Sequence, residues 1–305
     1  GMPQENEQAR EDRGGGDAIR VHHTTLKQGI RATPKFAEKG LASFAANVGT
    51  KCGHDCTYCS TGAMLRMHAS FEDAGEDPFG RGYAIVDPTS PERVGRSAAR
   101  RRKDKRGLVQ ICTTVDAWSP EAQMLDLGRR CLAAILAEPG WEVRILTKNA
   151  AVAKDFDLIE AHRDRVRVGL SLTAVPSKQQ LMSIIEPNAS TMSGRIAATK
   201  KAHRLGLRTY AMLCPLLPGI ADDQESVREL VRLGVEFGAE EFFVEPFNAR
   251  GKAIGQTADA LEQAGFQSQA AAVRSVRRKK AWSPYVRRLL AVVQAELRAV
   301  GALRK

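Results

Sequence analysis

The chain has 305 residues and 43% hydrophobic content, enough for one large α/β barrel or two smaller domains. It carries 46 Lys and Arg against 35 Asp and Glu, and the formal charge of +11 favours polyanionic partners such as nucleic acid. No apolar run approaches the roughly 20 residues that span a bilayer, and the polar N-terminus lacks the apolar core of a secretion signal. We therefore expect a cytoplasmic protein with no membrane partner.

Regular structure is predicted to begin near Leu41, after an N-terminal segment, 1–40, that is disordered or extended. Residues 1–17 are charged and glycine-rich, so they cannot bury enough apolar surface to fold. After Leu41, short β-like runs alternate with longer amphipathic stretches, which is the pattern of βα units. Six strands are predicted, at 43–48, 108–113, 142–147, 166–172, 208–214 and 241–247. Helices are predicted between them, at 120–137, 150–162, 191–205 and 222–237.

Six parallel strands joined by right-handed crossovers curl into a barrel that does not close. We therefore predict an α/β protein with an incomplete, TIM-like (β/α)6 barrel over residues 41–250. Within it, the stretch 60–107 reads as an insertion rich in Gly, Pro and charge. A helical C-terminal extension follows at 251–305, with its clearest helical spacing at 284–299.

Three of the six cysteines, Cys52, Cys56 and Cys59, lie within eight residues in KCGHDCTYCS, after the first predicted strand. Clustered thiols in a reducing compartment bind metal more often than they form disulfides. A loop this short can ligate three corners of a [4Fe–4S] cubane and leave the fourth iron open. The alternative is a closed structural zinc site in which His54 is the fourth ligand. The sequence favours the cluster, because zinc ligands usually come as two separated pairs and no second pair is present.

This C-x3-C-x2-C loop, with the aromatic Tyr58 before its last cysteine, resembles the signature of the radical S-adenosylmethionine (SAM) superfamily. In that family SAM chelates the open iron, and an electron from the cluster cleaves SAM to methionine and a 5′-deoxyadenosyl radical. The resemblance implies an enzyme with a [4Fe–4S] cluster and SAM as cofactors, reduced by an electron donor such as flavodoxin or ferredoxin. It also implies that Tyr58 packs near the adenine; a lid that only covers the cluster is the alternative.

Further blocks resemble the family of spore photoproduct lyase, often labelled DNA repair photolyase-like. These blocks are ICTTVDAWSPEAQ, ILTKN, VGLSLTA, IIEPNAS and CPLLPGIADD, in the family's order over roughly residues 44–250. Most of them end a predicted strand, so their polar residues are expected at the rim where barrel active sites assemble.

The resemblance implies that polar residues of these blocks contact SAM: Thr113, Thr114, Asp116, Lys148, Ser171 and Glu186. Lys148 would bind the SAM carboxylate, and Ser171 and Glu186 would bind the ribose. One residue of the second-strand block would bind the SAM amino group. Each assignment has an ordinary alternative: Lys148 as a surface lysine, Ser171 as a small strand residue and Glu186 as a helix cap.

Cys112 is the candidate catalytic residue, because CTTVD resembles the segment in which a cysteine of spore photoproduct lyases returns a hydrogen atom to the product radical. The alternative is a buried strand residue, since cysteine is small and apolar. The segment between Cys59 and Cys112 departs from the family in length and content. Cys131 and Cys214 are predicted to lie in the core.

Two basic runs, RSAARRRKDKR at 96–106 and RSVRRKK at 274–280, could supply the sequence-independent part of nucleic-acid binding or be solvated faces. Three functions therefore remain open. The first is a radical SAM enzyme that acts on DNA or another nucleic acid, as in DNA repair. The second is a radical SAM enzyme that acts on a peptide, a protein or a small metabolite. The third is a non-catalytic, zinc-containing nucleic-acid-binding protein.

Overall fold

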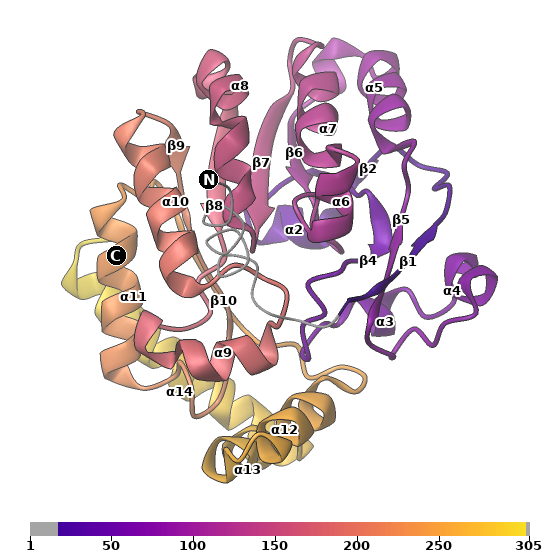
Figure 1. Ribbon diagram of the computed structural model, residues 1–305. Coiled ribbons are helices and arrows are strands. Elements are labelled where there is room, and N and C mark those ends of the chain that lie inside the picture. Colours follow the sequence, from indigo (N-terminus) through magenta and orange to yellow (C-terminus); the bar gives the residue numbers. More distant parts are fainter. Residues whose placement is uncertain (1–17, 303–305) are drawn as a thin grey trace, which may run out of the picture.

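A six-stranded sheet forms the centre of the computed structural model, which describes residues 18–302 (Figure 1). Its strands, in spatial order, are β2 (Ile30–Ala32), β3 (Phe44–Ala46), β6 (Leu108–Ile111), β7 (Glu142–Thr147), β8 (Val166–Leu170) and β9 (Arg208–Thr209). The strands from β3 to β9 pair in parallel, whereas β2 is antiparallel to β3 at the edge of the sheet.

A second pair of parallel strands, β10 (Ala211–Leu216) and β11 (Phe242–Pro246), continues the curve of this sheet. A parallel bridge from Ser171 to Met212 connects the end of β8 to β10. The predicted incomplete (β/α)6 barrel is confirmed. The predicted strand 208–214 is broken at Tyr210, whose ring packs where a side chain on Gly169 would otherwise stand.

Helices cover the outer face of the barrel: α5 (Ser90–Arg100), α6 (Pro120–Met124), α7 (Leu127–Leu136), α8 (Phe156–Ala161), α10 (Met192–Arg204) and α11 (Gln224–Glu236). The predicted helix 120–137 is divided in two because Asp126 has a positive φ of 51°. In place of 150–162, a 3-10 turn (Ala150–Asp155) leads into α8. The helices predicted at 191–205 and 222–237 begin after the side-chain caps Thr191 and Asp223.

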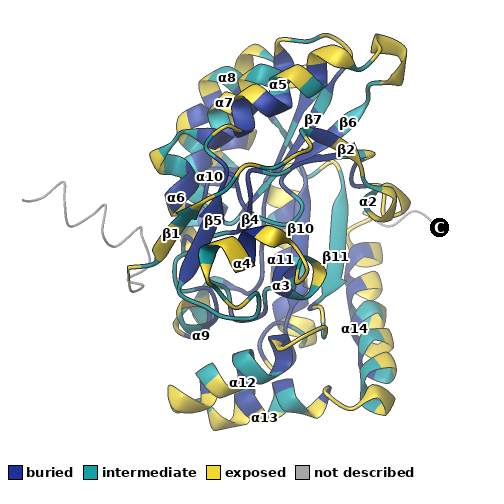
Figure 2. Cartoon of the chain, turned by 90° about the vertical axis from the view of Figure 1, so that its right-hand side faces the viewer, coloured by how far each residue is buried: buried dark blue, intermediate teal, exposed yellow. Residues whose placement is uncertain are grey.

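The core lies between the sheet and these helices, and Figure 2 shows the buried residues concentrated there. One apolar cluster joins β6, β7 and β8 to α7 and α8, with Trp118 and Trp141 among its largest buried side chains. A second cluster joins β10 to α11 and to the C-terminal helices. Burial of this apolar surface is the main stabilising contribution to the barrel.

Regular structure begins well before the predicted start near Leu41. The strand β1 (Arg20–His23) pairs with β5 (Tyr83–Val86), which also pairs with β4 (Gly49–Lys51), and a short helix α2 (Pro34–Glu38) follows β2. The prediction for residues 1–17 lies outside the described residues.

The stretch 60–107, predicted as an insertion, supplies a crossover helix of the barrel and one strand of a separate three-stranded sheet. It contains α3 (Thr61–Met64), α4 (Ala69–Ala74), β5, α5 and a 3-10 turn (Lys103–Lys105). Helix α5 packs against α7 and is the crossover from β3 to β6. The sequence pattern concealed this helix, because four of its eleven residues are arginine or glutamate and only a narrow stripe is apolar.

The C-terminal region is helical, as predicted. After α9 (Gln179–Ile185) and the barrel strands come α12 (Ala253–Gln263), α13 (Gln267–Ser275) and α14 (Lys279–Ala299). Helix α14 contacts α11 through an apolar stripe that contains Leu289, Val293 and Leu297. Within the described residues, no helix is long and apolar enough to cross a membrane.

Candidate active site at the cysteine loop

The cysteine loop, residues 52–59, directly follows β4 and is anchored to several elements. The Gly53 amide donates to Glu121 Oε2 at 3.0 Å, and Asn188 Nδ2 donates to the Gly53 carbonyl at 2.9 Å. The Thr57 amide donates to the Ile185 carbonyl at 2.9 Å. Gly53 is needed here, because a Cβ atom would lie 2.3 Å from Glu121 Oε2. Burial raises the pKa of Glu121 to about 7.

The three thiols of the loop, on Cys52, Cys56 and Cys59, are each half-buried. Burial raises the pKa of Cys56 to about 12, and the charge of Lys148 acts against that rise. Within residues 18–302 no three Cys, His, Asp or Glu side chains converge on the position of a single metal ion. A [4Fe–4S] cluster does not require that convergence, since each cysteine binds a different iron. The three thiols of one short loop are thus compatible with a cluster, to which each would contribute one ligand.

His54 lies inside the cysteine loop but is turned toward the barrel strands. Its Nδ1 lies 3.3 Å from Asp116 Oδ2, and its Nε2 lies 3.3 Å from Asn149 Nδ2. Burial lowers the pKa of His54 to about 4, so the ring is neutral at pH 7. A proton on Nδ1 satisfies both contacts. Because both ring nitrogens are engaged, His54 is not available as the fourth ligand of a zinc site.

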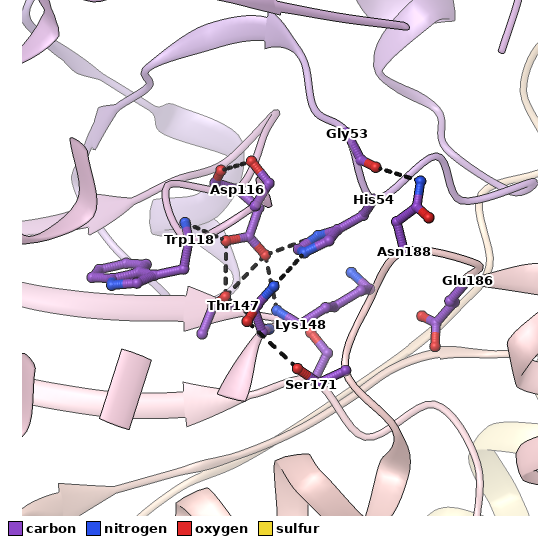
Figure 3. Close-up of polar contacts among 12 residues, drawn as sticks. Gly53, His54, Asp116, Trp118, Thr147, Lys148, Ser171, Glu186 and Asn188 are labelled. Atoms are coloured by element: carbon purple, nitrogen blue, oxygen red, sulfur yellow. Dashed lines mark hydrogen bonds and ion pairs between the residues drawn. The ribbon is translucent and has the colours of Figure 1, made fainter. Parts of the chain in front are cut away.

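Asp116 connects the second and third barrel strands to the cysteine loop (Figure 3). It accepts hydrogen bonds from the Trp118 amide at 2.9 Å, Thr147 Oγ1 at 2.8 Å and the Lys148 amide at 2.9 Å. With His54, four protein donors surround this buried carboxylate. These contacts give Asp116 a positioning role at the barrel rim, and its predicted contact with SAM stays a prediction.

Thr113 and Thr114, the other candidates of this block, are held by Asn47 at the end of the first barrel strand. Asn47 Oδ1 accepts hydrogen bonds from both threonine amides at 2.9 Å, and Asn47 Nδ2 donates to Thr113 Oγ1 at 2.9 Å. The sequence prediction missed Asn47 because it placed this residue inside the strand 43–48, whereas β3 ends at Ala46.

Lys148 lies beside the cysteine loop, with its Nζ 5.8 Å from the centroid of the Tyr58 ring. Burial lowers its pKa, but the nearby Cys56 and Glu186 outweigh that effect, and the net change raises the pKa. Lys148 therefore stays charged. The structure brings Cys56, Tyr58, Lys148 and Glu186 together, so Lys148 is not the surface lysine of the alternative interpretation.

Glu186 forms a buried ion pair with Arg195 of α10, with 2.8 Å between Oε1 and Nη2. Tyr58 donates its hydroxyl to Glu186, and Thr173 Oγ1 donates to it at 2.9 Å. Burial acts to raise the pKa of Glu186, but Arg195 and Lys148 bring it below its ordinary value. Glu186 thus holds Tyr58 in place. Sequence analysis missed Arg195, which reads as a surface residue of a polar helix.

Ser171, at the end of β8, is buried and its hydroxyl has no hydrogen-bond partner in the described part of the chain. Its amide donates to the Thr147 carbonyl at 3.0 Å, and Arg195 Nη1 donates to its carbonyl at 3.0 Å. Buried hydroxyls are normally hydrogen-bonded. A fixed serine that lacks a partner at the barrel rim fits a site for a ligand hydroxyl, such as the ribose of SAM.

The cysteines outside the loop have different surroundings. Cys112 is 3% exposed and belongs to the same apolar cluster as Cys131 of α7, which is fully buried as predicted. Cys214, also predicted to be a core residue, is partly buried against the apolar cluster of Leu41, Tyr210 and Met212, and its Sγ donates to Glu245 Oε2 at 3.6 Å. Burial raises the pKa of Cys214 to about 12 against the opposing charge of Lys148.

An open barrel of parallel strands with a three-cysteine loop at one rim can hold an iron–sulfur cofactor where barrel active sites assemble. The chain belongs to the radical SAM superfamily, whose family model matches residues 46–263. It is a radical SAM enzyme, and this membership implies a [4Fe–4S] cluster and SAM as its cofactors.

Curated relatives include uncharacterised proteins from a virus, a bacterium and an archaeon. The protein of Acidianus two-tailed virus is 26% identical over 213 residues, which is 68% of each chain. A protein of Mycobacterium tuberculosis is 24% identical over 239 residues, 78% of this chain and 68% of that one. A protein of Methanocaldococcus jannaschii is 24% identical over 62% of this chain and 66% of its own.

Solved structures of spore photoproduct lyase share the fold. A variant with bound AdoMet and dinucleoside spore photoproduct has a TM-score of 0.56 and 20% identity, covering 86% of this chain and 72% of that chain. A tyrosine-to-phenylalanine variant has a TM-score of 0.63 and 18% identity, covering 99% and 85%. The structural resemblance predicted from the sequence blocks is confirmed.

Proposed function

We propose that this enzyme holds a [4Fe–4S] cluster through Cys52, Cys56 and Cys59, cleaves SAM reductively, and acts on nucleic acid. The observation that carries the first part is the meeting of the cysteine loop with Lys148 and Ser171 at one rim of the barrel. When bound, the cluster supplies the electron that releases a 5′-deoxyadenosyl radical from SAM.

The residues of the chain would bind and orient the cofactor. Lys148, charged and fixed through its amide by Asp116, is suited to the carboxylate of SAM. Ser171 is suited to a ribose hydroxyl, since its own hydroxyl lacks a partner in the described residues. Tyr58, held by Glu186 under the ammonium group of Lys148, closes this side of the site against water.

Two observations support nucleic acid as the substrate class. The chain carries a net charge of +11, and cationic residues gather in two runs. The fold is that of spore photoproduct lyase, which is a protein solved with a dinucleoside spore photoproduct. Because this similarity is one of fold alone, the proposal of a nucleic-acid substrate depends mainly on the positive charge. The experiment below tests it.

Hydrogen return by Cys112 stays a prediction. Its burial among apolar side chains fits a packing role equally well. Cys112→Ala is expected to leave SAM cleavage intact and to alter only the quenching of the product radical. Loss of the cluster in this variant would refute that division of roles.

The substrate class is tested by 5′-deoxyadenosine formation from SAM under anaerobic, reducing conditions with the reconstituted full chain. We expect ultraviolet-irradiated DNA to stimulate formation roughly tenfold or more, and DNA lesions to change in mass. Undamaged DNA and a peptide mixture are the matched controls. Stimulation by peptides alone, or by no nucleic acid at all, would overturn the nucleic-acid proposal and leave SAM cleavage standing.

A further inference from the structure

A cavity of about 470 Å³ lies between residues 27–32, which lead into β2, and one face of α5. Its lining contains six cationic side chains and no Asp or Glu. They are Lys27, Arg31, Arg93, Arg96, Arg100 and Arg101. We call this cavity the arginine groove. A hollow surrounded by one sign of charge concentrates counter-ions of the other sign.

Only one of these cations is neutralised by an acidic residue of the described chain. Arg93 Nε lies 3.0 Å from Asp87 Oδ2. The other five cations have no ion pair with an acidic residue in residues 18–302. Glu92, also on α5, pairs with Arg130 of α7 at 3.1 Å and does not line the groove. The groove therefore keeps most of its positive charge for a ligand.

The side chain of Arg101 gives a second indication that the groove binds an anionic ligand. Its guanidinium lies 4.6 Å from the centroid of the Phe44 ring, which fixes the side chain against the barrel. Its buried Nε has no hydrogen-bond partner in the described residues. A buried donor that lacks a partner is costly, and an anionic ligand would satisfy it.

The cationic side chains are spread along the groove and do not gather at one point. Arg96 and Arg100 lie one turn apart on the exposed side of α5, about 6 Å along the helix axis at a rise of about 1.5 Å per residue, and Lys27 and Arg31 line the other side of the groove. A strand of B-form nucleic acid carries one phosphate for about every 3.4 Å of helix axis, so this length corresponds to about two successive phosphates. A single small anion would leave most of these cations unsatisfied.

The arginine groove is connected to the active-site rim through a short path. Arg93 Nη2 donates to the Asn47 carbonyl at 3.0 Å. The side chain of Asn47 in turn holds the amides of Thr113 and Thr114. One residue, Asn47, therefore separates the groove from the second-strand block of the site. The end of the groove at Arg93 therefore lies nearer to this block than the end at Arg101, which packs on Phe44 at the start of β3.

We infer that the arginine groove binds the phosphodiester backbone of the nucleic-acid substrate. This inference rests on the proposed substrate class and gives that substrate a location on the enzyme. The backbone supplies affinity and register here, and base contacts remain the task of the active site.

The second basic run supplies a matched control. Its Arg274 is already paired with Asp259 at 2.8 Å and with Glu262 at 2.9 Å. Four further cations of this run are exposed: Arg277, Arg278, Lys279 and Lys280. Replacing them with Gln removes the same charge as replacing four exposed cations of the groove.

The test compares two fourfold variants of the reconstituted full chain. The groove variant carries Lys27→Gln, Arg31→Gln, Arg96→Gln and Arg100→Gln; the control variant carries Gln at 277–280. Binding of a fluorescent single-stranded DNA 12-mer is measured by anisotropy from about 50 to 200 mM salt. We expect the groove variant to lose roughly tenfold or more in affinity, and its slope of log K against log salt to flatten by about 2–3. The control variant should keep both its affinity for the 12-mer and its salt slope within about twofold of the wild-type values.

Thermal unfolding midpoints of both variants, expected within about 2 °C of the wild type, show whether a loss comes from unfolding. Equal weakening of the two variants would overturn the groove while leaving nucleic-acid binding intact. Failure of the wild type to bind the 12-mer at low salt would overturn the substrate class itself. Binding of tripolyphosphate without binding of the 12-mer would overturn the assignment to nucleic acid.

Discussion

Nδ1 of His54 lies 3.3 Å from Oδ2 of Asp116, and this contact joins the cysteine loop to the second barrel strand. The same carboxylate fixes the amide of Lys148. The loop that would hold the cluster and the lysine that would bind SAM are therefore positioned by one side chain. Disturbing Asp116 should affect both at once.

Asp116→Asn is expected to destabilise the protein by about 2–3 kcal/mol, because an amide group would face buried donors that now point at a carboxylate. Urea unfolding measures this loss. SAM cleavage should fall as well, since Lys148 loses an anchor. Asp126→Asn is the matched control: Asp126 makes no side-chain cap bond and its positive φ suits Asn. Equal stability of the two variants would contradict the positioning role of Asp116.

The Glu186–Arg195 pair is expected to contribute to folding more than to SAM binding. Both side chains are 1% exposed, so Arg195→Met would leave a buried carboxylate without its counter-charge at a cost of about 3–5 kcal/mol. Arg208→Met, which removes an exposed pair with Glu240, should cost less than about 1 kcal/mol. Denaturation of the two variants in urea tests this difference. A cost below about 1 kcal/mol for Arg195→Met would refute it.

Ser171→Ala separates SAM binding from folding. Since the hydroxyl has no partner among the described residues, its removal should change the free energy of unfolding by less than about 1 kcal/mol. Loss of a bond to the ribose should weaken SAM binding by roughly tenfold, which equilibrium dialysis with the reconstituted enzyme would detect. Ser193→Ala, on the exposed start of α10, is the control. Unchanged SAM affinity in Ser171→Ala would remove Ser171 from the cofactor site.

The lowered pKa of Glu76 leads us to expect that the stability of the folded protein depends on pH. Arg20 Nε donates to its carboxylate at 2.8 Å, and this hydrogen bond lowers the pKa of Glu76 from 4.5 to about 2. A lowered folded-state pKa stabilises the protein above pH 4.5, and the effect fades as pH falls toward 2. Glu76→Gln should cost about 1 kcal/mol at pH 7, because Arg20 is largely exposed. Urea midpoints of variant and wild type should converge only as pH falls to about 2; a constant difference would contradict the linkage.

The hydrophobic periodicity and the spacing of the motifs were sufficient to predict the barrel. The strand predicted at 142–147 is β7 residue for residue, because Val143 and Ile145 alternate with the polar Glu142 and Arg144 in the period of a strand. Helix α5 was missed because its polar face faces the arginine groove and solvent, so its composition resembles a loop. Strand 208–214 was predicted as one element because Tyr210, an excellent strand residue, interrupts it only through its packing on Gly169.

The site could be predicted only as far as local sequence reaches. The cysteine loop and Lys148 follow from residues that are adjacent in sequence or directly after a strand. Arg195 and Asn188 reach the site from segments after β8, and their partners are set by tertiary packing. Sequence alone also cannot show that four protein donors surround the carboxylate of Asp116.

The most direct test of the central claim is the cofactor chemistry of the cysteine loop. The full chain is reconstituted anaerobically with iron and sulfide, and iron content and 5′-deoxyadenosine release from SAM are measured with a reductant. We predict about four irons per chain and SAM cleavage in the wild type and in Cys131→Ala, and loss of both in Cys52→Ala, Cys56→Ala and Cys59→Ala. A colourless, zinc-loaded protein without SAM cleavage, or equal loss in Cys131→Ala, would contradict the account.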